Sequence, residues 1–131
     1  MGFGETTSDR IEAVAKVIVD AAFKVHRILG PGLLESVYVT CLAHELKMRG
    51  LKVARGVKVP IVYEGTELDA ELRLDLLVED LVIVEAKSVD KILPVFEAQS
   101  LTYLRLLRLR LCLLINFNVV LFKDGIKRIV L

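Results

Sequence analysis

Apolar residues in the first third of the chain recur at steps of three and four, which predicts two amphipathic helices. We expect the first helix over residues 11–29 and the second over residues 33–49. The intervening Gly30-Pro31-Gly32 suits this arrangement, because glycine ends helices readily and proline is well placed in a first helical turn. Residues 1–8, before the first helix, are expected to be flexible.

The hydrophobic period changes to two after the second helix, which predicts an antiparallel meander of three strands. The expected strands are residues 52–63, 66–78 and 81–87. Short turns, Glu64-Gly65 and Glu79-Asp80, separate them. A proline at position 60 within the first strand favours a place at the edge of the sheet.

The last third of the chain predicts one more helix and a return to the sheet. The helix is expected over residues 94–107, followed by a buried apolar strand over 109–117. A closing hairpin is expected from strands at 119–122 and 126–130. The element order α-α-β-β-β-α-β-β therefore predicts one α/β domain over residues 1–131, with a mixed sheet flanked by helices.

The composition is 54% hydrophobic, which raises the question of a membrane span. The longest charge-free run, residues 111–122, is shorter than the roughly 20 residues that a spanning helix needs. No N-terminal segment has the order of a signal peptide. We therefore expect a soluble, cytoplasmic protein without a membrane association, whose excess apolar residues serve buried strands or an oligomer interface.

The formal net charge is only +1, but it is unevenly distributed. Residues 51–90 hold five Lys/Arg and nine Asp/Glu, a balance of −4, and residues 91–131 hold seven and two, a balance of +5. An acidic middle is suited to a metal ion and a basic final third to a phosphate backbone. Ordinary solvated surfaces explain the same numbers equally well, so charge alone does not decide the function.

Three charged residues interrupt the apolar pattern of the second and third expected strands: Asp75, Glu85 and Lys87. Charges at such positions are costly unless they are paired or bound to a metal. Alternation places Glu85 and Lys87 on one face and Ala86 on the other. A two-residue turn would pair Asp75 with Val84, whereas a three-residue turn or a bulge pairs it with Glu85. We predict the second register.

Two neighbouring carboxylates and a main-chain carbonyl, that of Ala86, can hold Mg²⁺ or Mn²⁺. Such a site can hydrolyse phosphodiesters, with Lys87 orienting the attacking water or offsetting negative charge. The spacing of Glu85 and Lys87 alone is also typical of an exposed salt bridge, which is the commoner arrangement.

Four motifs in order narrow these alternatives. Gly32-Leu-Leu-Glu35-Ser-Val-Tyr38 has the form GxxExxY, preceded by Val25-His26-Arg27-Ile-Leu-Gly30-Pro31 and followed by Asp75…Glu85-Ala-Lys87 and Glu97-Ala-Gln99. From about residue 9 to residue 131, the chain resembles the GxxExxY family of the PD-(D/E)xK nuclease superfamily. The resemblance implies a restriction-endonuclease-like fold. One departure is Leu106-Leu107-Arg108, where related sequences tend to have a glycine turn, which leaves the end of the third helix open.

By position, the resemblance makes Asp75 and Glu85 the metal carboxylates and Lys87 the catalytic lysine. Glu35 matches an additional acidic residue at the metal, and Gln99 matches a helix residue that lines the same pocket. The catalytic set implied is therefore Asp75, Glu85, Lys87, Glu35 and Gln99. His26 and Tyr38 belong to the family pattern without an assigned role; helix packing and anchoring of the second helix are the simpler accounts of them.

The resemblance implies a nuclease that depends on Mg²⁺ or Mn²⁺ and hydrolyses phosphodiester bonds of DNA or RNA. The alternative is a catalytically inactive module that keeps the fold for nucleic-acid or protein binding and assembly. High apolar content and near-zero net charge favour the alternative, because a lone nuclease usually has a more basic groove. A small domain without an obvious clamp for a duplex also suggests a homodimer.

Overall fold

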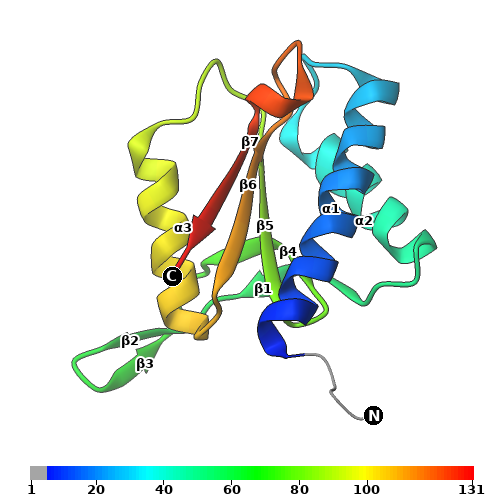
Figure 1. Cartoon of the computed structure of the whole chain (residues 1–131). Coiled ribbons are helices and arrows are strands. Elements are labelled where there is room, and N and C mark those ends of the chain that lie inside the picture. Colours follow the sequence, from blue (N-terminus) through cyan, green and yellow to red (C-terminus); the bar gives the residue numbers. More distant parts are fainter. Residues whose placement is uncertain (1–5) are drawn as a thin grey trace, which may run out of the picture.

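A five-stranded mixed sheet separates two helices on one face from a third helix on the other (Figure 1). The computed structural model describes residues 6–131. Helices α1 (Thr7–Leu29) and α2 (Glu35–Met48) cover one face, and α3 (Pro94–Leu107) covers the opposite face. The predicted α/β class, with a mixed sheet flanked by helices, is confirmed.

The strand order in the sheet is β1-β4-β5-β6-β7. Strands β5 and β6 are parallel, and the other neighbours are antiparallel. Helix α3 is the crossover between the two parallel strands, as parallel pairing requires. The strands are β1 (Val53–Lys58), β4 (Arg73–Val78), β5 (Val82–Lys87), β6 (Leu111–Asn116) and β7 (Ile126–Val130). All six residues of β6 are buried, because helices cover both faces of the central strands.

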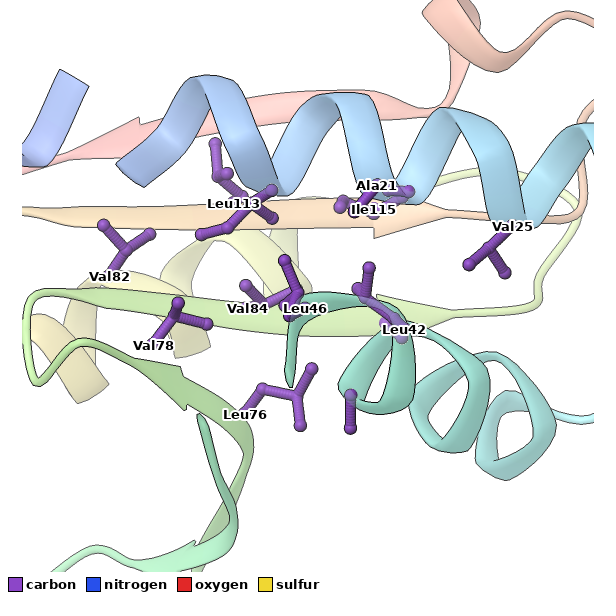
Figure 2. Packing of buried hydrophobic residues seen from close by; sticks show 14 of the residues in the cluster. Ala21, Val25, Leu42, Leu46, Leu76, Val78, Val82, Val84, Leu113 and Ile115 are labelled. Carbon is purple, nitrogen blue, oxygen red and sulfur yellow. The ribbon is translucent and has the colours of Figure 1, made fainter. Parts of the chain in front are cut away.

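Alternate residues of the central strands fill two separate cores. The core beneath α1 and α2 is shown in Figure 2 and includes Ala21, Val25, Leu42, Leu46, Leu76, Val78, Val82, Val84, Leu113 and Ile115. The core beneath α3 contains Ile83, Cys112 and Leu114 from the sheet, packed against Tyr103 and Leu104 of the helix. Each strand therefore contributes side chains to both faces.

The predicted three-strand meander is wrong in its first two strands, each of which breaks in two. The chain leaves β1 after Lys58 and forms a separate two-stranded sheet from β2 (Ile61–Tyr63) and β3 (Thr66–Leu68). Pro60 lies at the first break and has no N–H to donate to a ladder. At the second break, before β4, Glu71 adopts a left-handed φ of 54°. The resulting hairpin projects from the body of the domain (Figure 1).

The predicted closing hairpin is also wrong, because residues 119–121 form no strand. The carbonyl of Val119 is bound by the ring of His26 instead of by a neighbouring strand. A short 3-10 helix, η1 (Phe122–Asp124), then buries Phe122 beside Phe23 of α1, with ring centroids 5.8 Å apart. Strand β7 therefore pairs with β6.

The structure defines the start of α1 and the end of α3, which the sequence left uncertain. Thr6 caps α1 in a reciprocal capping box with Asp9, so residues 6–8 begin the helix although they were expected to be flexible; residues 1–5 lie outside the described part of the chain. Helix α3 ends at Leu107, as predicted. Arg108 adopts the left-handed conformation, φ 57° and ψ 44°, that glycine usually takes at this position.

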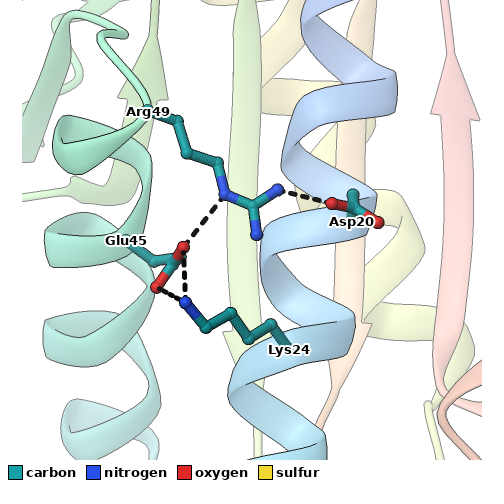
Figure 3. A network of polar contacts seen from close by, with 4 residues as sticks. All are labelled: Asp20, Lys24, Glu45 and Arg49. Carbon is teal, nitrogen blue, oxygen red and sulfur yellow. Dashed lines mark hydrogen bonds and ion pairs between the residues drawn. The ribbon is translucent and has the colours of Figure 1, made fainter.

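An ion-pair network joins α1 to α2 at the surface (Figure 3). Arg49 contacts Asp20 at 2.6 Å and Glu45 at 3.0 Å, and Lys24 contacts Glu45 at 3.1 Å. The hydrogen bond from Arg49, followed by that from Lys24, lowers the pKa of the Glu45 carboxyl. This network fixes the end of α2 against α1.

Within residues 6–131, no helix combines the length and apolar character that a membrane crossing requires.

Candidate metal centre and active site

The register of the β4–β5 hairpin decides whether Asp75 and Glu85 meet. Val78 pairs with Val82, Leu77 with Ile83 and Leu76 with Val84, so three residues form the turn. The next position in this register brings Asp75 opposite Glu85. The predicted three-residue register is confirmed.

Regular backbone pairing between β4 and β5 stops at this point. Backbone N–H groups that would donate to carbonyls of the neighbouring strand donate to the two carboxylates instead. The Asp75 N–H donates to Oε2 of Glu85 at 2.7 Å. The Ala86 N–H donates to Oδ2 of Asp75 at 2.8 Å. Each carboxylate is thus held by the backbone of the opposite strand, and the two side chains lie at one seam between β4 and β5.

Strand β4 is irregular at Asp75, which explains how a charged side chain reaches this seam. Leu74 and Leu76 would share a face in a regular strand, yet Leu74 packs beneath α3 and Leu76 beneath α1 and α2. On the other side of β4, Gly56 of β1 lies opposite Asp75 with a positive φ of 63°. The change of face is therefore centred on Asp75.

The two carboxyl groups are electrostatically strained in the absence of a cation. Burial raises the pKa of Asp75 above its ordinary value. Burial, followed by the charge of Asp75, raises the pKa of Glu85 to about 8. Glu85 is only 5% exposed. The hydrogen bond from the Asp75 N–H and the Lys87 charge lower its pKa, but they offset the increase only in part. A nearby cation would relieve the cost of holding two ionised carboxylates here.

Lys87 lies on the α3 side of β5, while Ala86 packs into the opposite core, as alternation predicted. Its ammonium nitrogen lies 4.6 Å from the centroid of the Phe96 ring. No ion pair joins Lys87 to a carboxylate in the described part of the chain. The ammonium therefore contacts the Phe96 ring and forms no salt bridge with the two carboxylates, although its charge lowers the pKa of both.

Glu35 is the first residue of α2 and lies just beyond the end of β5. Its Oε1 accepts a long hydrogen bond, 3.4 Å, from the Ser88 N–H. Its charge raises the pKa of both Asp75 and Glu85. Over residues 6–131, however, no three acidic, His or Cys side chains are grouped closely enough to share a metal ion. The structure brings Asp75 and Glu85 together and leaves Glu35 nearby, so its role as a ligand stays a prediction.

Gln99 is exposed on α3 and has no hydrogen bond within the described residues. Its helical position lies one turn from both Phe96 and Tyr103, which pack toward the sheet. Its place in the site stays a prediction. The sequence did not single out Phe96, whose ring contacts the Lys87 ammonium. Its three-residue spacing from Gln99 was the available signal.

His26 and Tyr38 have structural contacts that account for them. The His26 ring donates through Nε2 to the Val119 carbonyl at 2.7 Å. Tyr38 is fully buried, and its ring stacks on Phe117 with centroids 4.5 Å apart. The Tyr38 hydroxyl donates to the Gly30 carbonyl at 2.7 Å and accepts from the Leu33 N–H at 3.1 Å. The tyrosine thus fixes the loop that leads to Glu35.

Replacing Tyr38 with phenylalanine is expected to lower the free energy of unfolding by about 1–3 kcal/mol. The change removes one hydroxyl that serves both Gly30 and Leu33 and leaves the stacked ring in place. Urea denaturation measures the loss. Tyr63→Phe is the matched control, because that side chain is 65% exposed. Equal stability of the two variants would contradict the anchoring role.

The chemistry of Asp75 and Glu85 fits a divalent cation. One oxygen of each carboxylate accepts a backbone N–H. In the described part of the chain, no fully buried side-chain oxygen lacks a hydrogen-bond partner, so the second oxygens, which accept no hydrogen bond, retain some contact with solvent. Two fixed carboxylates with open oxygens are a suitable partial ligand set for a hard cation such as Mg²⁺, which keeps several waters.

Comparison with protein families gives a match over nearly the whole chain. Residues 12–129 match the model of the PD-(D/E)XK nuclease superfamily, a span that includes the seam between β4 and β5. The searches of curated proteins and of solved structures found no match. Nucleases of this superfamily generally use divalent metals. With its flanked mixed sheet and paired strand carboxylates, the chain belongs to the PD-(D/E)XK nuclease superfamily.

Proposed function

We propose that the protein is a metal-dependent nuclease that hydrolyses phosphodiester bonds of DNA or RNA. The reciprocal hydrogen bonds of Asp75 and Glu85 carry this proposal, because they hold two carboxylates at one point beside Lys87. The position of the pair within a nuclease superfamily domain supports it.

In this proposal Asp75 and Glu85 hold Mg²⁺ or Mn²⁺ together with the main-chain carbonyl of Ala86. The Ala86 N–H points to Asp75 on β4, and in a strand the C=O of a residue points the same way as its N–H. The Ala86 carbonyl therefore faces the same seam. Glu35 is proposed to join from the end of α2, directly or through a water molecule.

The metal, when bound, polarises the phosphoryl group and makes its bound water more acidic. The ammonium of Lys87 is proposed to orient the attacking water or to offset negative charge on the phosphate. Gln99 is proposed to line the pocket from α3. In the reaction the water loses a proton as its oxygen bonds to phosphorus, the ester P–O bond breaks, and the leaving oxygen takes a proton.

Two exposed arginines beside the seam support a phosphate-bearing substrate. Arg55 of β1 donates to Oγ1 of Thr40 at 2.8 Å, and its charge lowers the pKa of Asp75. Arg73 of β4 donates to the Gly56 carbonyl at 3.3 Å. The Arg55 charge thus acts at the proposed metal site, and Arg73 lies two residues before Asp75 in β4; a nucleic-acid backbone needs such cationic partners.

The test is cleavage of mixed DNA and RNA substrates with Mg²⁺ or Mn²⁺, comparing the wild type with Glu85→Ala and Lys87→Ala. We expect cleavage by the wild type alone. Cleavage that survives both substitutions would indicate a contaminant or a different site.

Calorimetric titration of Mn²⁺ into the wild type and Asp75→Ala tests metal binding separately. If the wild type binds no metal at millimolar concentration, a binding or assembly module explains the fold better.

A further inference from the structure

The β2–β3 hairpin is an arm with little support of its own. Its strands make three residue pairs, Ile61 with Leu68, Val62 with Glu67 and Tyr63 with Thr66. The Glu64-Gly65 turn has φ values of 49° and 80°, the conformation of a tight hairpin turn. An isolated two-stranded hairpin is only marginally stable in water, so this arm gains from packing against another surface.

The arm exposes apolar side chains at positions that do not pack onto the domain. Tyr63 is 65% exposed and Leu68 is 48% exposed, and the pairing places both on the same face of the hairpin. A hollow of about 450 Å³ lies at the base of the arm. Its lining consists of Pro60 and Leu68 with three charged residues, Lys58, Glu67 and Asp69, and so carries one net negative charge. An apolar face beside this hollow favours a partner that carries both apolar and cationic side chains.

The arm and the segment that follows it carry acidic residues that form no ion pair within the described residues. Glu64, Glu67 and Glu71 are exposed and form no ion pair over residues 6–131. Lys58 already pairs with Asp69 at 2.6 Å. Two negative charges on the arm and one just after it therefore remain available.

A cationic set lies at the same end of the molecule. Arg105, Arg108 and Arg110, at the end of α3 and before β6, are exposed and form no ion pair in the described part of the chain. The base of the arm and the end of α3 share one core, in which Val59 and Leu72 pack with Leu104 and Leu107. Figure 1 shows the arm projecting beside the end of α3.

We propose that the arm and these arginines form a self-complementary surface through which two copies of this chain associate. Around a two-fold axis, the acidic arm of each copy lies against the arginines of the other, and each contact occurs twice. Both sets lie at the same end of the molecule, and neither forms an ion pair within residues 6–131, which leaves both free for this exchange. The proposal concerns assembly and does not depend on nuclease activity.

Nucleic acid is the other candidate partner for the arginines. The adjacent carboxylates of Glu64, Glu67 and Glu71 disfavour it, because they repel phosphate at the same end of the molecule. A second copy satisfies the cationic and acidic sets together, whereas a phosphate backbone satisfies only one of them.

A mixing experiment with charge-reversed variants tests the proposal. The acid variant carries Glu64→Lys and Glu67→Lys, and the base variant carries Arg105→Glu and Arg110→Glu. In sedimentation at micromolar concentration and low salt, we expect a wild-type dimer whose dissociation constant rises about tenfold or more in each variant alone. An equimolar mixture should restore the dimer, since both contacts of the mixed pair are again between opposite charges.

Lys16→Glu with Lys47→Glu is the matched control, because it changes the net charge as the base variant does at exposed sites outside the arm and the arginine set. This control should leave association unchanged, and circular dichroism should show every variant folded. A wild type that stays monomeric at millimolar concentration would overturn the proposal. So would a mixture that fails to associate. Loss of duplex DNA binding in the base variant, with no wild-type dimer, would assign the arginines to nucleic acid.

Discussion

Replacing Glu85 with glutamine is expected to stabilise the metal-free protein and to remove its stabilisation by Mn²⁺. The amide oxygen of glutamine can still accept the Asp75 N–H bond, while the buried negative charge disappears. Because burial raises the pKa of Glu85 to about 8, its ionisation opposes folding at neutral and basic pH. We expect a gain in the free energy of unfolding on the order of 2–4 kcal/mol at pH 8.5.

The pH dependence of this gain has a definite sign. The folded protein holds the Glu85 proton up to a pKa of about 8, whereas the unfolded chain loses it near the ordinary glutamate pKa of 4.5. The wild type therefore loses stability as pH rises between these two values. The difference between Glu85→Gln and the wild type should be small at pH 4.5 and largest above pH 8. Thermal denaturation in a chelating buffer measures it.

Asp90→Asn is the control for this experiment, because Asp90 is exposed on the loop after β5. It should change neither the metal-free stability nor the response to Mn²⁺. With Mn²⁺ present, the wild type should gain stability by mass action, and Glu85→Gln should gain much less. A Glu85→Gln variant that is less stable than the wild type at pH 8.5 would refute the account of the strained carboxylates.

Replacing Lys87 with methionine is expected to lower the cleavage rate by about 100-fold or more while Mn²⁺ still binds. The charge of the ammonium acts on both carboxyl groups without an ion pair to either, and methionine keeps an apolar side chain against Phe96. Single-turnover cleavage with saturating substrate measures the rate, and calorimetry measures the metal affinity. Loss of metal binding in Lys87→Met would instead make the lysine part of the structure of the site.

The Phe96 ring provides a graded companion to this experiment. Phe96→Leu removes the cation–π contact, so Lys87 should be less well placed and cleavage should fall less than in Lys87→Met. Phe96→Tyr keeps an aromatic face and is the matched control, which should retain the wild-type rate. A Phe96→Leu variant as active as the wild type would show that the ring does not position Lys87.

The sequence predicted the site register more accurately than the ends of the strands. Apolar residues on both sides of Glu79-Asp80 must remain buried, and this requirement restricts the hairpin to few pairings. The break at Pro60 was visible only as an edge preference, because period-two alternation continues across it. The prediction of a closing hairpin was wrong because of a tertiary contact: the Val119 carbonyl is bound by His26, which is distant in the sequence.

Some residues of the candidate site could be predicted from the local sequence pattern, and others could not. Asp75, Glu85 and Lys87 were visible because charges interrupt apolar strands, and this signal is local. Glu35 and Gln99 were reached only through the resemblance, since nothing in their own segments distinguishes them from ordinary helix-surface residues. Phe96 was missed because an aromatic residue on a helix normally indicates a core, and its ring does pack against one.

The length of the β4–β5 turn is a functional variable that no side-chain motif records. Its three residues place Asp75 opposite Glu85, and the carboxylates then act as hydrogen-bond acceptors for the backbone. Deleting one turn residue would leave Asp75, Glu85 and Lys87 unchanged in name and move Asp75 opposite a different residue. A relative can therefore keep every charged residue and still lack the paired carboxylates if its turn is one residue shorter. Its metal site should be inferred only after the register of its hairpin is known.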